Sequence, residues 1–269
     1  MMKTRTVVIT GSARGLGYEM AKCFRKKNYN VVISDLNKKD IDKAKKEILG
    51  IKGKGEVLAL VCDITKDKDI INLISKSNGK FKCIDIWVNN AGVNQPDKMI
   101  WELSSDEIKR MVEIDLTSTM VASRYIMEEM IKVNHGAIYM VEGHGSNNAI
   151  VPGLSIYGTA KRGITYFSRA LAKEAEVNKN DIIVGRLAPG IMITDFLVNA
   201  FRDKKMNLSE KNKRIYNILG DYPDVVAKYL VNRMIDNTSN DVRINWLTNR
   251  KVIWKFITYS FKKNKKCNS

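Results

Sequence analysis

The feature that most constrains the fold of this chain is a repeated alternation of short, β-branched apolar runs with helix-length segments. The runs that we expect to be buried strands are Thr6–Thr10, Asn30–Ser34, Val57–Val61, Ile84–Val88, Ala137–Val141 and Ile182–Leu187. The segments that we expect to be helices are Leu16–Lys27, Lys38–Leu49, Lys66–Ser77, Ser105–Lys132 and Ser155–Glu176. Strand followed by helix, repeated, builds right-handed crossovers. The sequence therefore predicts an α/β fold, a three-layer doubly wound parallel sheet in one domain.

The last quarter of the chain has a different character. Pro223–Met234 is expected to be a helix, Val242–Leu247 a final strand, and Asn249–Lys263 a terminal helix capped by Asn249. From position 242 onward there are eight basic residues and no acidic one, with apolar and aromatic side chains between them. We therefore divide the chain into a domain of residues 1–248 and a basic, aromatic helix and tail of residues 249–269. The terminal helix either packs on its own domain or binds a membrane surface or a partner.

Composition limits the partners and the compartment. The 269 residues include 46 Lys+Arg and 29 Asp+Glu, a formal net charge of +17, which favours anionic partners in general. No nucleic-acid-binding signature accompanies this charge, so we expect no nucleic acid partner. The four cysteines are scattered and the two histidines are few, so we expect no metal and a reducing, cytoplasmic location. Because the N-terminus runs directly into the first expected strand, we expect no signal or transit peptide.

A glycine-rich stretch lies between the first expected strand and the first helix. It reads TGSARGLG over residues 10–17. Glycines here let the chain turn tightly and let backbone N–H groups approach a pyrophosphate. Asp35 ends the second strand, where a carboxylate can bind the ribose hydroxyls of NAD and would repel the 2′-phosphate of NADP. Arg14 favours the opposite choice, because a guanidinium pairs with phosphate. We therefore expect NAD(H) as cofactor, with NADP(H) as the alternative.

Two further motifs follow the third and fourth strands. They are Cys62-Asp63-Ile64 and Asn89-Asn90-Ala91-Gly92. Each alone is also explained by a helix cap or a simple loop. Their place at successive strand ends is where open α/β sheets bind ligands, so we assign both to the cofactor site.

Tyr157 and Lys161 lie four residues apart on one face of an expected helix. A neighbouring cation stabilises a phenolate and lowers the pKa of a tyrosine from its usual value near 10. Tyr157 could then give a proton to a carbonyl or take one from an alcohol. The spacing alone is common on helix surfaces. Combined with the glycine motif, the Asn89–Gly92 turn and Pro189-Gly190 after the sixth strand, it favours a functional role for the pair over a purely structural one.

These motifs resemble, in order and spacing, those of the short-chain dehydrogenase/reductase superfamily over residues 5 to about 200. The matching elements are TGSARGLG, CDI, NNAG, YGTAK and LAPGIMITD. The resemblance implies a Rossmann fold, a homodimer or homotetramer, Tyr157 as general acid and Lys161 bound to the nicotinamide ribose. The other cofactor contacts that it implies are Gly11, Ser12, Arg14, Gly15, Leu16, Gly17, Asp35, Leu36, Asp63, Ile64, Asn90, Ala91, Gly92, Pro189, Gly190, Ile191 and Thr194.

Two positions depart from the superfamily's pattern. The superfamily usually has a serine 13 residues before the tyrosine, where this chain has His144. Either Ser146, the nearest hydroxyl, or His144 is then expected to polarise the substrate carbonyl. The helix asparagine that holds a relay water aligns with Asp115, which can accept hydrogen bonds but cannot donate as an amide does. These departures leave a second hypothesis open, a dinucleotide-binding sensor with weak catalysis.

A narrower resemblance covers nearly the whole chain. The stretch VEGHGSNNAIVPGLSIYGTAKRG looks like the corresponding loop of chlorophyll b reductases, and the likeness continues through PGIMITDFLVNA, YPDVVAKYLVNRM and INWLT. It implies NAD(P)H-dependent reduction of a formyl group on a large apolar tetrapyrrole. Asp35 is a departure, because those enzymes look built for NADPH. The leading hypothesis is thus a reductase of a carbonyl (formyl or ketone) on an apolar substrate. A generic ketone, sterol or 3-oxoacyl reductase is the alternative, and peripheral membrane contact is expected through the terminal helix.

Overall fold

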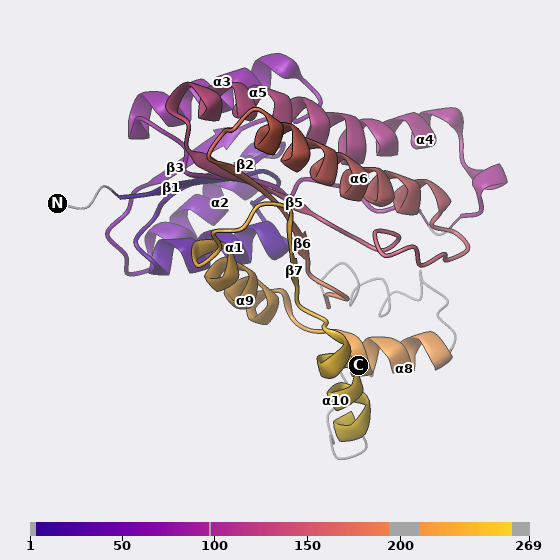
Figure 1. The fold of residues 1–269 in the computed structure, drawn as a ribbon. Helices are drawn as coiled ribbons and strands as arrows, with labels where there is room; N and C mark the ends of the chain where they lie inside the picture. Colours follow the sequence, from indigo (N-terminus) through magenta and orange to yellow (C-terminus); the bar gives the residue numbers. More distant parts are fainter. Residues whose placement is uncertain (1–3, 97, 194–209, 260–269) are drawn as a thin grey trace.

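A seven-stranded parallel sheet forms the centre of the molecule (Figure 1). The computed structural model describes residues 4–96, 98–193 and 210–259. Along the sheet the strands follow the order β3-β2-β1-β4-β5-β6-β7. Their bounds are β1 Thr6–Ile9, β2 Asn30–Asp35, β3 Val57–Val61, β4 Ile86–Asn89, β5 Gly136–Val141, β6 Ile182–Ala188 and β7 Val242–Asn245. The winding reverses between β1 and β4, which confirms the predicted doubly wound fold.

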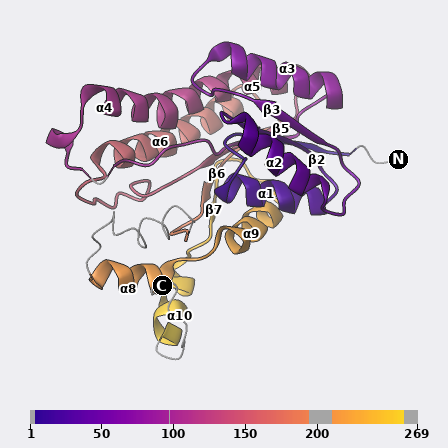
Figure 2. The same cartoon turned by 180° about the vertical axis from the view of Figure 1, so that it is seen from behind.

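Helices cover both faces of the sheet and complete three layers, as Figures 1 and 2 show from opposite sides. One face carries α1 (Gly15–Lys26), α2 (Lys38–Leu49) and α9 (Pro223–Ile235). The other carries α3 (Asp67–Phe81), α5 (Ser118–Val133) and α6 (Ser155–Val177). A short 3-10 helix, η1 (Ile100–Glu102), precedes α4 (Ser105–Val112). Because both faces are covered, the central strands bury every side chain, which is why they read as continuous apolar runs.

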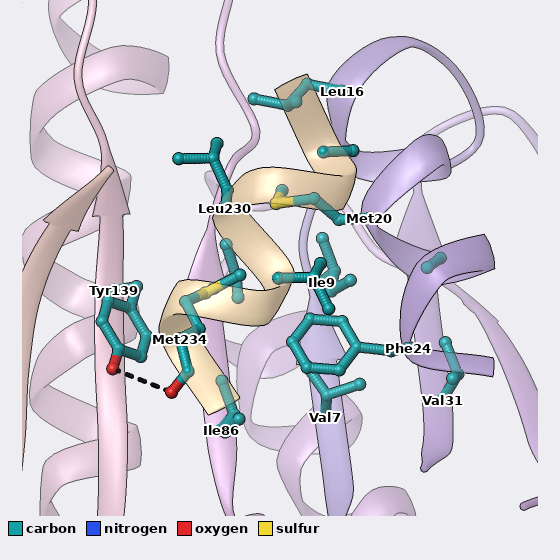
Figure 3. Packing of buried hydrophobic residues seen from close by; sticks show 14 of the residues in the cluster. Val7, Ile9, Leu16, Met20, Phe24, Val31, Ile86, Tyr139, Leu230 and Met234 are labelled. Carbon is teal, nitrogen blue, oxygen red and sulfur yellow. Dashed lines mark hydrogen bonds between the residues drawn. The ribbon is translucent and has the colours of Figure 1, made fainter. Parts of the chain in front are cut away.

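The C-terminal part of the chain belongs to the main core. Leu230 and Met234 of α9 pack into the cluster around Met20 and Phe24 of α1 (Figure 3). The buried Tyr139 of β5 donates its hydroxyl to the carbonyl oxygen of Met234 at 3.5 Å. The final helix before β7 is therefore held by the same apolar cluster as the first helix of the chain.

The long helix expected over Ser105–Lys132 is interrupted. Between α4 and α5 the chain makes a π-helical turn, η2 (Glu113–Thr117). Such a turn holds an extra residue, so it shifts the side chains that follow around the helix axis, and it is frequent at functional sites. Asp115 lies in this turn and is fully buried. The sequence prediction relied on the 3.6-residue spacing of apolar residues along a helix. One extra residue changes this spacing too little to be detected.

The end of the described chain forms two helices outside the three layers (Figure 1). They are α8 (Glu210–Leu219), which the sequence analysis did not predict, and α10 (Asn249–Tyr259). The expected cap of α10 was wrong: Thr248 Oγ1 accepts the Lys251 N–H at 3.3 Å, because Asn249 is already helical. The part of the expected helix beyond Tyr259 lies outside the described residues. Within the described ranges, no helix combines the length and the apolarity that a membrane span requires.

Candidate active site

A cleft of roughly 450 Å³ opens at the carboxyl ends of the central strands. It brings together residues from the ends of β1 to β5 with the start of α6. The predicted site residues in its wall are Gly11, Arg14, Leu16, Asp35, Leu36, Asp63, Ile64, Asn90, Ala91, Gly92, Tyr157 and Lys161. In a doubly wound sheet this edge, next to the point where the winding reverses, is where ligands bind.

Glycines let the first loop and the Asn90–Gly92 turn touch each other. Gly11 has φ +59°, and a Cβ on it would lie 2.7 Å from the Cα of Ala91. A Cβ on Gly17 would lie 2.5 Å from Asn90 Nδ2 and 2.7 Å from the carbonyl oxygen of Gly11. Because real Cβ atoms do not approach so closely, a side chain at either position would push the two loops apart.

Asn90 fastens these loops with its hydrogen bonds. Its Nδ2 donates to the carbonyl oxygens of Thr10 at 2.9 Å and Gly11 at 2.8 Å. Thr10 Oγ1 in turn accepts the backbone N–H groups of Asn90 and Ala91, each at 3.0 Å. The N-cap of α1, Arg14, makes no side-chain capping bond. The first N–H groups of α1 are thus left for an anion at the cleft.

Two carboxylates, Asp35 and Asp63, also line the cleft. Asp35 accepts the N–H groups of Ala13 at 3.2 Å and Leu36 at 2.8 Å. Asp63 accepts the hydroxyl of Thr65 at 2.7 Å and pairs with Lys66 at 3.1 Å. Burial alone would raise the pKa of Asp63, but these hydrogen bonds outweigh burial and lower it. Both positions therefore offer acceptor oxygens to hydroxyl or amino groups.

Tyr157 and Lys161 occupy the first turns of α6 and share the cleft wall. The Lys161 Nζ lies 5.5 Å from the centre of the Tyr157 ring. A Cβ on Gly143 would lie 2.9 Å from Tyr157 Cζ, so the phenol packs directly against the loop after β5.

The ionisation of this pair differs from the sequence-based expectation that Lys161 lowers the pKa of Tyr157. Burial raises the pKa of Tyr157, and the carboxylate of Asp115 raises it further. Burial likewise lowers the pKa of Lys161, against the pull of Asp115. Burial and Asp115 act in the same direction, so both favour the neutral phenol of Tyr157, which suits a proton donor.

Asp115 lies behind the cleft wall. Its Oδ1 accepts the Val93 N–H at 2.7 Å, and its buried Oδ2 has no partner among the described residues. Gly92 separates it from Lys161: a Cβ on Gly92 would lie 2.9 Å from Asp115 Oδ1 and 3.4 Å from Lys161 Nζ. Burial raises the pKa of Asp115, while Lys161 and the Val93 N–H oppose that rise.

The two candidates for polarising a carbonyl do not line the cleft. Ser146 is buried; its hydroxyl donates to the carbonyl oxygen of Lys161 at 3.1 Å and accepts the Gly143 N–H at 3.2 Å. His144 is exposed. Ser146 thus holds the loop after β5 against the backbone of α6.

The remaining predicted cofactor residues lie outside the cleft wall or the described chain. Ser12 lies buried in the loop after β1 and donates its hydroxyl to the carbonyl oxygen of Ile9 at 2.7 Å. Gly15 and Gly17 form the start of α1 beneath the wall. The predicted stretch after β6 borders the cleft only through its neighbour Met192; the predicted positions are Pro189, Gly190 and Ile191. Thr194 lies outside the described residues.

Sequence reasoning missed several residues of the cleft wall, notably Glu142 and Arg110. Glu142 is buried at the end of β5, pairs with Arg243 of β7 at 2.7 Å and accepts the Thr165 hydroxyl at 3.1 Å. An acidic residue directly after a fully apolar strand was a signal that could have identified it. Within the described part of the chain, no group of three or more His, Cys, Asp or Glu side chains could hold a metal ion.

Known proteins are similar to this chain over the residues that form the cleft. The sequence profile of the short chain dehydrogenase family matches residues 5–205. Chlorophyll(ide) b reductase NOL, chloroplastic, of Oryza sativa subsp. japonica is 30% identical over 98% of this chain and 78% of its own length. The probable chlorophyll(ide) b reductase NYC1 of Arabidopsis thaliana is 28% identical over 94% of this chain, which spans about half (53%) of that protein. Among solved structures, an actinorhodin polyketide ketoreductase with NADPH has a TM-score of 0.80 at 20% identity, covering 91% of this chain and 97% of its own.

Proposed function

This chain belongs to the short-chain dehydrogenase family, an NAD(P)-dependent family of oxidoreductases, and from that premise we propose that it reduces a carbonyl group of an apolar substrate. The observation that carries the proposal is the shared cleft. The neutral phenol of Tyr157 faces the same space as the glycine loop and the uncapped start of α1. A proton donor and a place for a dinucleotide therefore meet at one edge of the sheet.

The residues present fit a nicotinamide dinucleotide, which supplies the hydride when bound. The first N–H groups of α1 and the loop around Gly11 would hold its pyrophosphate. Asp35 would accept the hydroxyls of the adenosine ribose, and this carboxylate favours NADH over NADPH. Arg14 also lines the cleft and favours the opposite choice, so the comparison of the two dinucleotides belongs in the first experiment.

The protein's own part in the reaction is proton transfer. Tyr157 gives its hydroxyl proton to the carbonyl oxygen as that oxygen gains negative charge. The Lys161 ammonium, buried beside the ring, stabilises the phenolate that remains. Asp115 lies next to Lys161 behind Gly92, where it can accept a proton or hold a water.

For the substrate we favour the formyl group of a large apolar molecule such as a tetrapyrrole. Two observations support this choice. The stretch of residues 141–163, from the end of β5 into α6, is similar to that of the chlorophyll b reductases, and NOL is a relative over nearly the whole chain. The loops that leave β4 and β5 also carry exposed apolar side chains, with Trp101 80% and Ile150 93% exposed. A cytoplasmic location and a homo-oligomeric state stay predictions.

The test is turnover with a defined tyrosine variant. Purified protein is titrated with NADH and NADPH, and oxidation is followed with a panel of apolar aldehydes and ketones that includes chlorophyll b. Tyr157→Phe should abolish turnover and leave dinucleotide affinity unchanged. Tyr166→Phe, an exposed tyrosine on the same helix, is the control and should keep full activity. Turnover confined to ketones or 3-oxoacyl thioesters would favour the generic reductase instead. Dinucleotide binding without any turnover would favour a sensor, and no binding would overturn the proposal.

We also propose that α10 makes weak contact with anionic membrane surfaces. Two lysines of this helix face the protein: Lys255 pairs with Asp221, and Lys251 lies over the ring of Trp246. Its apolar side chains face outward and are 48–65% exposed: Ile253, Trp254, Phe256 and Ile257. The sequence after position 259 adds four lysines and no acidic residue, which complements an anionic headgroup layer.

Vesicle binding tests this contact. The protein should sediment with phosphatidylserine-containing vesicles at low salt, and less so with neutral phosphatidylcholine vesicles or at high salt. Trp254→Ser together with Ile257→Ser should weaken binding, whereas Ile71→Ser, an exposed apolar residue on α3, should not. Truncation after Leu247 that leaves vesicle binding unchanged would assign α10 a purely structural role.

A further inference from the structure

The helix that carries Tyr157 begins without a cap of its own. Its N-cap residue, Leu154, has no side chain that can accept a hydrogen bond from the first turn. The first N–H groups of an α-helix have no partner within the helix, and leaving such a group unpaired and buried destabilises the fold. The first turn of α6 therefore needs an acceptor from elsewhere in the molecule.

Gln95 provides that acceptor. Its Oε1 accepts the N–H of Ile156 at 3.0 Å and the N–H of Tyr157 itself at 3.1 Å. The side chain is 7% exposed, and its Nε2 donates to the carbonyl oxygen of Lys98 at 3.3 Å, which fixes the orientation of the amide. One side chain from the loop after β4 thus caps a helix that starts some sixty residues later.

The same short loop also binds Asp115, the buried carboxyl behind the cleft wall. The Val93 N–H donates to Asp115 Oδ1 at 2.7 Å, and Val93 lines the cleft. Residues 93–95 therefore contact both the carboxyl behind Lys161 and the backbone of Tyr157. A displacement of this loop would move the proton donor relative to the rest of the cleft.

We propose that Gln95 is a positioning residue for Tyr157, because its side-chain oxygen fixes the first turn of α6 and with it the phenol in the cleft wall. The effect on kcat rests on the proposed function. The effect on the structure of the first turn of α6 rests only on the two hydrogen bonds from Gln95. Effective proton transfer needs donor and acceptor within hydrogen-bond reach, and small misplacements of a catalytic group cost large factors in rate.

Four substitutions separate the role of the oxygen from that of the side-chain volume. Gln95→Leu keeps the size and removes the acceptor. Gln95→Asn keeps the amide but is one methylene too short to reach both N–H groups. Gln95→Glu keeps an acceptor oxygen at the same reach. Lys98→Ala is the control on the same loop, because Gln95 uses only the backbone of Lys98, whose side chain pairs with Glu107 at 2.7 Å.

The expected result is a split between rate and affinity. Gln95→Leu and Gln95→Asn should lower kcat at least roughly tenfold, with the dinucleotide Kd within about twofold of the wild-type value. Gln95→Glu keeps the acceptor oxygen but loses the Nε2 donor to the Lys98 carbonyl oxygen, so it should restore part of kcat, and Lys98→Ala should match the wild type. Unchanged kcat in the Leu and Asn variants would overturn the proposal.

A second readout does not depend on the substrate. Amide hydrogen exchange at Ile156 and Tyr157 should speed up in Gln95→Leu and Gln95→Asn, and stay slow in Gln95→Glu. If the wild-type protein shows no turnover at all, the proposed function fails while the exchange rates still decide the role of Gln95. Unchanged exchange at both amides would overturn the positioning role.

Discussion

Among single residues, Asp115 is a buried carboxyl of the site with one oxygen left unpaired within the described part of the chain. Burial raises its pKa above the usual 3.8. A carboxyl whose pKa is raised in the folded state stabilises the fold while it is protonated. That stability is lost as the pH rises from the unfolded-state pKa through the folded-state pKa.

Asp115→Asn should therefore change the pH dependence of stability. Asparagine does not titrate, so the variant should gain free energy of unfolding over the wild type as the pH rises from about 4 to about 8. Urea unfolding of both proteins across this range measures the gap. The exposed Asp236→Asn is the control for the change of side-chain type. A gap that does not grow with pH would contradict the burial argument.

Among the elements, the glycine loop and the Asn90–Gly92 turn depend on each other's shape. A Cβ on Gly17 would meet both the Asn90 side chain and the backbone of Gly11. We expect Gly17→Ala to lower dinucleotide affinity at least tenfold, about 1.4 kcal/mol, as measured by nicotinamide fluorescence. Gly79→Ala on α3, where a Cβ meets nothing within 4 Å, should leave affinity unchanged. Equal affinities in both variants would show that the two loops are not tightly packed.

At this scale the sequence predicted most of the fold, and the strand-end motifs predicted most of the cleft. Runs such as Ala137–Val141 are apolar because helices cover both faces, so their pattern is visible locally. The π-helical turn at Asp115 adds one residue to a periodic pattern, and periodicity averages over it. The Gln95–Tyr157 and Glu142–Arg243 contacts join residues far apart in the chain, and no local pattern reveals such a pairing.

At the scale of the whole molecule, α9 and β7 from the last quarter of the chain are part of the main core. Leu230 of α9 is fully buried in the cluster that includes α1 and β1. Leu230→Ala should lower the free energy of unfolding by about 2–5 kcal/mol, because it leaves a cavity between the two ends of the chain. Val225→Ala, at an exposed position of the same helix, should cost far less. Denaturant unfolding checks both, and a small loss for Leu230→Ala would show that α9 packs loosely.

Asp221 connects α10 to the cleft wall at Met192. Its backbone pairs with the stretch around Met192, with the Ile193 N–H donating to its carbonyl oxygen at 2.9 Å. Its carboxylate accepts the indole N–H of Trp246 at 2.7 Å and pairs with Lys255 of α10. Anything that displaces α10 therefore pulls on a wall of the cleft. If binding of a membrane surface to α10 alters the affinity of the cleft for its ligand, the ligand must alter the affinity of α10 for the membrane by the same factor. Thermodynamic reciprocity requires this equality.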